Sequence, residues 1–328
     1  MSLTQVLKTQ EIKEAFAAAF KRPDFQKTVP PLVAASRAKD SSLVGIAFDY
    51  LFRSELGDTQ IVRSGARPEQ ESEEGVSNLS QSDASTVGKL KRSLRVIEFL
   101  PIARAGLELL CQSDDVSIKI KKQAKHAWEH AQGAEMRKQM ATGENLTLTE
   151  RAHICLQMAK LDQVYRARYV HEDFETVDPD DVSDLMTMFE QVKFNIFKAH
   201  EVCLLNPPLK AAGLVGGADA DIVLDDLLID LKTTTSFSLT INQLNQLYGY
   251  LVLSRLGGFA GVKSSPEIRR LGIYFARYDY LFTFNVEDVI SSDALKAFCK
   301  WFKKTLSASQ VDALIRPVTR KKTIEWRF

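Results

Sequence analysis

A tight hairpin in the last third of the chain constrains the fold more than any other feature. Two runs that suit β-strands, residues 220–224 and 227–231, are separated only by Asp225 and Asp226. A connection of two residues closes an antiparallel turn, and such a turn fixes the register of the strands that it joins. The partner of every residue near the turn therefore follows from counting outward.

Charged side chains gather on one face of this predicted hairpin. Counting outward pairs Asp221 with Asp230 and Asp219 with Lys232. Because side chains alternate between the two faces of a strand, these four residues share one face. The opposite face is apolar and carries Ile222, Leu224, Leu227 and Ile229. Three carboxylates and one ammonium group are thus expected in one small patch.

A divalent cation would relieve the repulsion in this patch, because one lysine does not neutralise three acids. Mg²⁺ and Mn²⁺ prefer carboxylate, carbonyl and water oxygens. We therefore expect Asp221 and Asp230 to bind such a metal, with the carbonyl of Leu231 as a third ligand. Asp219 is a candidate ligand for a second ion. Lys232 would orient a water whose pKa the metal lowers, so the pattern predicts a phosphodiester hydrolysis site.

This arrangement resembles the PD-(D/E)xK nuclease superfamily, especially its RecB-like branch. The matching residues are Asp221, Asp230, Leu231, Lys232, Gln246 and Tyr250. Ala220 stands where the family has proline, and Asp230 stands where glutamate is commoner. The resemblance implies an α/β fold with a restriction-endonuclease-like mixed-sheet core. It also implies hydrolysis of nucleic acid, with DNA as the expected substrate and Mg²⁺ or Mn²⁺ as the cofactor.

The elements on either side of the hairpin supply further candidates. Gln243, Gln246 and Tyr250 lie three or four residues apart, so they share one side of the helix that follows the hairpin. The resemblance suggests that they hold a nucleic-acid strand or brace the lysine. In the superfamily a helix before the sheet often supplies another acid. Glu201, near the end of a helix predicted over residues 178–205, is therefore a candidate metal ligand.

The remaining sequence predicts a helical N-terminal region at residues 1–175, followed by the nuclease core at 176–328. Helical patterns cover residues 11–21, 41–56, 89–112, 115–140 and 147–169. Residues 63–87 are polar, acidic and serine-rich, which predicts a mobile loop. We assign no chemistry to Asp49 or Arg53, because the aromatic-rich stripe around them is typical of a core helix.

Composition narrows the class of protein. The net charge is +1 over 328 residues, so any contact with nucleic acid must be local. The basic tail after residue 316 and, more weakly, Arg277 are candidates for such contacts. No apolar run approaches the ~20 residues of a membrane helix and no signal-peptide core is evident, so we expect a cytoplasmic protein without a membrane partner. The four cysteines lack metal-ligand spacing, which predicts buried reduced thiols and no iron-sulphur cluster.

Two other functions fit the same residues. A catalytically inactive nuclease fold would bind nucleic acid without cleaving it. A helical scaffold would recruit a protein partner through the N-terminal region, and the hairpin would then be structural only.

Overall fold

A six-stranded mixed sheet forms the centre of the computed structural model, which describes residues 3–25, 28–64, 94–98, 102–139 and 146–315. The strands, in their order across the sheet, are β1 (Arg95–Glu98), β2 (Val202–Leu205), β3 (Ile222–Leu224), β4 (Leu227–Lys232), β5 (Arg270–Phe275) and β6 (Tyr280–Asn285). The pairs β1–β2 and β4–β5 are parallel, and the other neighbours are antiparallel. The predicted α/β class with a mixed sheet is confirmed.

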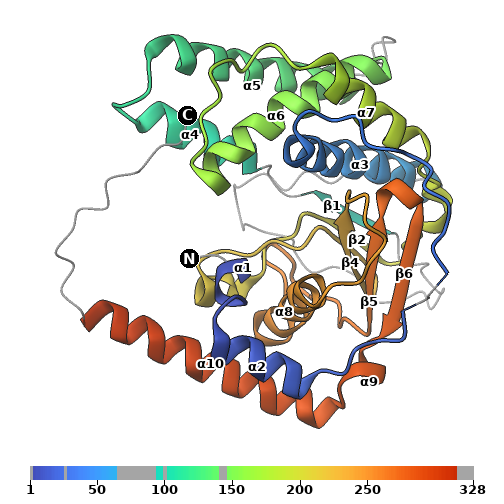
Figure 1. Ribbon diagram of the computed structural model, residues 1–328, viewed down its shortest axis with the longest axis vertical. Coiled ribbons are helices and arrows are strands. Elements are labelled where there is room, and N and C mark those ends of the chain that lie inside the picture. Colours follow the sequence, from blue (N-terminus) through green and yellow to red (C-terminus); the bar gives the residue numbers. More distant parts are fainter. Residues whose placement is uncertain (1–2, 26–27, 65–93, 99–101, 140–145, 316–328) are drawn as a thin grey trace, which may run out of the picture.

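Helices cover both faces of this sheet (Figure 1). One face is covered by α3 (Ser41–Ser64), α6 (Leu148–Ala167) and α7 (Pro179–Glu190). The other face is covered by α1 (Leu3–Val6), α2 (Gln10–Ala19), α8 (Ile241–Gly257), α9 (Val286–Val289) and α10 (Ser292–Ile315). Helices α4 (Ile102–Gln112) and α5 (Ile118–Gln139) pack with α6 in a third apolar cluster. Short 3-10 helices lie at η1 (Phe194–Ile196), η2 (Lys210–Val215) and η3 (Ala276–Tyr278).

Alternating side chains divide the core of the sheet into two layers. Val223 and Leu228 pack on the α8 side, whereas Ile222 and Ile229 pack on the α3 side. Phe16 of α2 belongs to the first layer, and the apolar residues of α3 belong to the second. Segments from before and after residue 175 therefore share both layers, and β1 lies in the same sheet as the strands of the C-terminal part.

The hairpin has the register that its short turn predicts. Ile222 pairs with Ile229, and the turn residue Asp225 has a φ of 54°. Aspartate tolerates this left-handed conformation better than most residues because its short side chain bonds locally. Its carboxylate accepts hydrogen bonds from the backbone N–H groups of residues 200–202. The turn therefore also anchors the start of β2.

Side-chain caps begin the helices that cover the sheet. At α6 the hydroxyl of Thr147 accepts a hydrogen bond from the N–H of Glu150, whose carboxylate accepts one from the N–H of Thr147. This capping box satisfies two N–H groups at the helix start and confirms the predicted start of this helix. At α7 the carboxylate of Asp178 accepts from the N–H of Asp180 and Pro179 occupies the first turn, as predicted.

Two predicted helices are wrong in part. The pattern at 89–112 is split in its described part, because residues 95–98 form β1 and Ile102–Gln112 is helical. The helix predicted over 178–205 ends at Glu190, and Val202–Leu205 is the buried strand β2. In a short apolar run that is buried on both faces, hydrophobic periodicity does not distinguish a strand from a helix. The predicted loop at 63–87 and the basic tail lie outside the described residues, apart from residues 63 and 64 at the end of α3.

The cysteines only partly follow their predicted burial. Cys203 in β2 and Cys299 in α10 are buried, whereas Cys111 at the end of α4 is exposed. The apolar stripe of α4 faces its neighbouring helices, and Cys111 lies outside that stripe.

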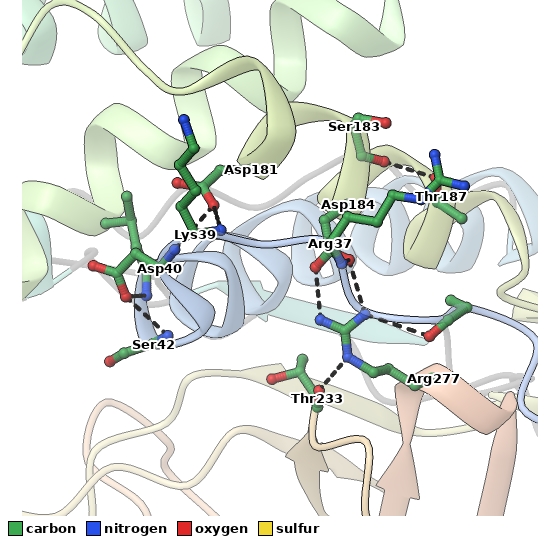
Figure 2. A network of polar contacts seen from close by, with 12 residues as sticks. Arg37, Lys39, Asp40, Ser42, Asp181, Ser183, Asp184, Thr187, Thr233 and Arg277 are labelled. Carbon is green, nitrogen blue, oxygen red and sulfur yellow. Dashed lines mark hydrogen bonds and ion pairs between the residues drawn. The ribbon is translucent and has the colours of Figure 1, made fainter.

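Arg277 ties the connection between β5 and β6 to three other segments of the chain (Figure 2). Only 1% of the residue is exposed. Its guanidinium donates to both carboxylate oxygens of Asp184 in α7, at 2.6 and 3.1 Å. It also donates to the carbonyls of Thr233, at 2.6 Å, and Ala34, at 3.4 Å. The prediction of Arg277 as a phosphate contact is wrong, because the side chain is buried and four of its five N–H groups are bonded to protein acceptors.

Candidate active site

Three of the residues predicted to bind metal or orient water, Asp221, Asp230 and Lys232, meet at the end of the hairpin that lies away from its turn. The Nζ atom of Lys232 lies 2.5 Å from Oδ2 of Asp230. The backbone N–H of Leu231 donates to Oδ2 of Asp221 at 2.7 Å. We call Asp221, Asp230 and Lys232 the acid–lysine cluster. Strand β4 supplies two of its members, and the bend before β3 supplies the third.

Asp230 is the most unusual member of the cluster, because its exposed fraction is 0%. The ammonium group of Lys232 pairs with its Oδ2 atom at 2.5 Å. Among the described residues, no other donor serves either carboxylate oxygen. A fully buried carboxylate with one cation as its partner leaves oxygen lone pairs unsatisfied, so it calls for a further partner. A divalent cation is a partner of the right charge and the right preference for oxygen.

The charges in the cluster remain in conflict in spite of the lysine. Burial raises the pKa of Asp221 to about 7, and the charges of Asp230 and Asp49 add to this effect. Lys232 and the amide of Leu231 oppose it without cancelling it. Burial also raises the pKa of Asp230, against the attraction of Lys232. The cluster therefore takes up a proton more readily than separate carboxyl groups would.

A pH dependence of stability follows for the metal-free protein. The folded-state pKa of Asp221, about 7, lies above its ordinary value of 3.8. The contribution of this carboxyl group to stability is therefore fully present below about pH 4 and is lost as the pH rises through about 7. We expect Asp221→Asn to melt at an increasingly higher temperature than wild type as the pH rises from about 5 to 8. Thermal melts of both proteins in EDTA measure this difference, and a constant difference across the range would contradict it.

Lys232 is held in place from α8. Its Nζ atom donates to Oε1 of Gln246 at 3.2 Å, and Nε2 of Gln246 donates to the hydroxyl of Tyr250 at 2.8 Å. Burial alone would lower the pKa of Lys232, but the charges of Asp230 and Asp221 outweigh burial and raise it. Tyr250 is only 7% exposed. Of the two predicted roles for Gln246 and Tyr250, bracing the lysine is therefore the one that the contacts support.

Gln243, the third predicted residue of this helix face, has a local role. Its Oε1 atom accepts a hydrogen bond from the backbone N–H of Thr240 at 2.8 Å. The hydroxyl of Thr240 accepts from the N–H of Gln243 at 3.3 Å in return. This capping box begins α8 one turn before Gln246. The structure therefore does not join Gln243 to the acid–lysine cluster.

The other two predicted metal ligands, Glu201 and Asp219, are not joined to the acid–lysine cluster by any contact described below. Glu201 precedes β2 and donates its N–H to Asp225 in the hairpin turn, which places it at the opposite end of β3 from Asp221. Asp219 forms a bridge with Pro208. Burial raises the pKa of Asp219, and the charges of Arg166 and Arg53 oppose the rise.

Two carboxylates and one carbonyl remain as a ligand set. In the described part of the chain, no three His, Cys, Asp or Glu side chains lie close enough together to hold a metal ion. Asp221 and Asp230 are the pair at the cluster. The N–H of Leu231 points at Asp221, and the carbonyl of the same strand residue points to the same side. Leu231 therefore stays a candidate third ligand.

Comparisons of the chain with protein-family models, with curated proteins and with solved structures give no match. The superfamily assignment thus stays a prediction. Among the described residues, no helix is both long enough and apolar enough to cross a membrane.

Helix α3 brings Asp49 to the cluster, which the sequence analysis missed. A Cβ atom on Gly45 would lie 2.9 Å from the hydroxyl of Thr233, so α3 packs closely on the end of β4. Asp49 is one turn further along the same side of α3. Its charge raises the pKa values of Asp221 and Lys232, which places it within electrostatic reach of both.

A chain of polar contacts leads from Asp49 to α6. Arg53 donates twice to the carboxylate of Asp49, at 2.9 and 2.6 Å, and its guanidinium lies 5.0 Å from the ring centroid of Tyr50. The hydroxyl of Tyr50 donates to Asp162 at 3.1 Å, and Asp162 also accepts from Arg166 at 2.7 Å. Each ion pair joins residues four apart on one helix. For Asp49 and Arg53, a charge pair at that spacing among buried apolar residues of α3 is the signal in the sequence that could have identified them.

Proposed function

We propose that the protein is a metal-dependent nuclease of the PD-(D/E)xK kind, which hydrolyses phosphodiester bonds of nucleic acid, with DNA as the first substrate to test. The observation that carries the proposal is Asp230. It is fully buried beside Asp221, and Lys232 is the one donor to its carboxylate oxygens among the described residues. Such a group is suited to a cation and to a polyanionic substrate.

Each member of the site has a distinct role in this proposal. Asp221 and Asp230 would hold Mg²⁺ or Mn²⁺, with the carbonyl of Leu231 as a third ligand. A metal at this position would supply a water of lowered pKa and screen the charge of the attacked phosphate. Lys232 positions the attacking water in line with the leaving oxygen and stabilises the negative charge that develops on the phosphate. Gln246 fixes the lysine for both tasks, since it accepts a hydrogen bond from its ammonium group.

The topology around the cluster also supports this proposal. The hairpin β3–β4 continues through α8 into β5, which is parallel to β4. The reactive side chains thus lie on central strands, while the bracing residues come from the helix that crosses over the same face. A restriction-endonuclease-like core, which the resemblance implies, has this order of elements.

Metal dependence is the direct test. We expect wild-type protein to cleave circular single-stranded DNA or linear duplex DNA in Mg²⁺ or Mn²⁺ and to stop when EDTA is added. Loss of the closed circle would identify an endonuclease, and an intact circle beside a shortened linear duplex would identify an exonuclease. Calorimetry should detect Mn²⁺ binding to wild type and weaker binding to Asp221→Asn. No cleavage on either DNA together with no metal binding would refute the proposal.

The ion pair of Lys232 with Asp230 favours a second candidate. It partly neutralises the carboxylate without a metal, which a nuclease fold that binds nucleic acid but does not cleave it would also tolerate. Retained binding of DNA in Mn²⁺ with no cleavage would select this second function.

A further inference from the structure

Two tyrosines and two arginines lie within five consecutive residues at the C-terminal end of α6 and just beyond it. We call Tyr165, Arg166, Arg168 and Tyr169 the tyrosine–arginine patch. Tyr165 is 47% exposed and Tyr169 is 36% exposed. The side chain of Arg166 is 51% exposed. Large aromatic side chains are usually highly buried, so two exposed rings beside two cations mark a binding surface rather than part of a core.

Neighbouring groups hold both rings of the patch in place. Arg168 ends α6 with a φ of 56°, and its guanidinium lies 5.7 Å from the ring centroid of Tyr165. The ring of Tyr169 meets that of His171 edge to face, with centroids 4.7 Å apart. Rings that are already oriented lose less conformational freedom on binding a ligand. The buried Nη1 atom of Arg168 has no acceptor among the described residues.

A chain of side-chain contacts connects the patch to the acid–lysine cluster. Arg166 donates to Asp162, which accepts from the hydroxyl of Tyr50, and the guanidinium of Arg53 lies over the ring of Tyr50. Arg53 in turn pairs with Asp49, which is within electrostatic reach of Asp221 and Lys232. The patch and the cluster are therefore joined through α6 and α3.

The chemistry of the patch selects an unpaired strand. Tyrosine rings stack on the faces of single-stranded bases, and arginines contact phosphates and stack on bases. In a duplex the base faces are already stacked on one another, so an exposed ring gains no such contact. Alternating rings and guanidinium groups thus match a chain that alternates bases and phosphates.

We propose that the tyrosine–arginine patch binds unpaired nucleotides and delivers them to the acid–lysine cluster, so that the substrate is single-stranded nucleic acid or a single-stranded end. This assignment of substrate class rests on the proposed nuclease function. The binding itself does not require cleavage and is measurable alone.

Fluorescence anisotropy of a labelled oligothymidine of about 20 nucleotides, with the full chain in EDTA, tests the patch. We expect Tyr165→Ala and Tyr169→Ala each to weaken binding about 5- to 100-fold. The matched changes Tyr165→Phe and Tyr169→Phe keep the stacking face and should bind within about 2-fold of wild type. Ile196→Ala removes another exposed apolar side chain, 43% exposed, and should bind as wild type does.

Three results would overturn the proposal. Alanine variants that bind as tightly as wild type would exclude a role for the rings. Phenylalanine variants as weak as the alanine variants would show that stacking is not the contact. If the alanine substitutions weaken binding of a duplex of the same length as much as they weaken binding of the single strand, the patch does not select unpaired nucleotides. Such a result is expected for a surface that binds a protein or any polyanion. An oligouridine of equal length shows whether RNA replaces DNA at the same patch.

Binding and cleavage measured together distinguish failure of the patch proposal from failure of the nuclease proposal. Cleavage by wild type, with alanine variants that bind normally, would leave the nuclease proposal standing and refute the patch. Loss of binding in the alanine variants, with no cleavage by wild type in Mn²⁺, would leave the patch standing and refute the nuclease.

Discussion

Asp230→Asn is expected to leave the protein folded and to abolish cleavage. Burial raises the pKa of the Asp230 carboxyl group, and Asp221 remains near Lys232 as its counter-charge, so the neutral amide removes one of two competing acids. The same change removes a metal ligand and should lower the cleavage rate by a factor on the order of 10³ or more. Calorimetry should show weaker Mn²⁺ binding, and the melting temperature in EDTA should not fall.

Lys232→Ala provides the complementary result. It keeps both carboxylates, so Mn²⁺ should still bind, while cleavage falls by about 10²- to 10³-fold because nothing orients the water. Asp226→Asn is the matched control, since Asp226 lies in the turn of the same hairpin and pairs with Arg270 rather than with the cluster. Full cleavage by the Asp230 and Lys232 variants, with the expected metal binding by wild type, would remove this cluster from the reaction.

Arg277→Ala is expected to cause the largest loss of stability. The side chains of Arg277 and Asp184 are 2% and 0% exposed, so the substitution leaves a buried carboxylate without its cation. Breaking such a pair costs about 3–5 kcal/mol of unfolding free energy. Arg270→Ala breaks the exposed pair with Asp226 and should cost about 1 kcal/mol or less. Denaturant unfolding of both variants measures the contrast.

A double variant separates the charge from the packing. Arg277→Met with Asp184→Leu removes both charges together and should recover part of the lost stability. Recovery will be incomplete, because the carbonyls of Thr233 and Ala34 lose the donor that Arg277 supplies. An Arg277→Ala protein as stable as the Arg270→Ala protein would contradict the account of a buried ion pair.

Local features of the site could be predicted from the sequence. A two-residue turn specifies the pairing of Ile222 with Ile229, and alternation then assigns Asp230 and Lys232 to one face. Helical spacing likewise places Gln246 and Tyr250 on one side of α8, where a hydrogen bond joins them. In both cases the residues that interact lie close together in the chain.

Features that depend on distant segments could not be predicted in this way. The four residues of β1 form a strand because they pair with Val202–Leu205, and the local sequence of β1 does not predict this pairing. Asp49 reaches the cluster only because Gly45 lets α3 approach Thr233. Glu201 looked suitable while its segment was read as a helix, but as the residue before a strand it is fixed beside the hairpin turn.

The order of the strands also has a consequence for how the chain folds. Strands β2 to β6 pair in sequence order, whereas Arg95 of β1 meets Val202 across a long intervening stretch. Closing a long loop costs more entropy than closing a short one, so contacts near in sequence tend to form first. The spacing of Asp221, Asp230 and Lys232 depends on the shortest loop in the sheet. We therefore infer that these three side chains reach their mutual arrangement early, and that the edge strand docks on a hairpin already in register.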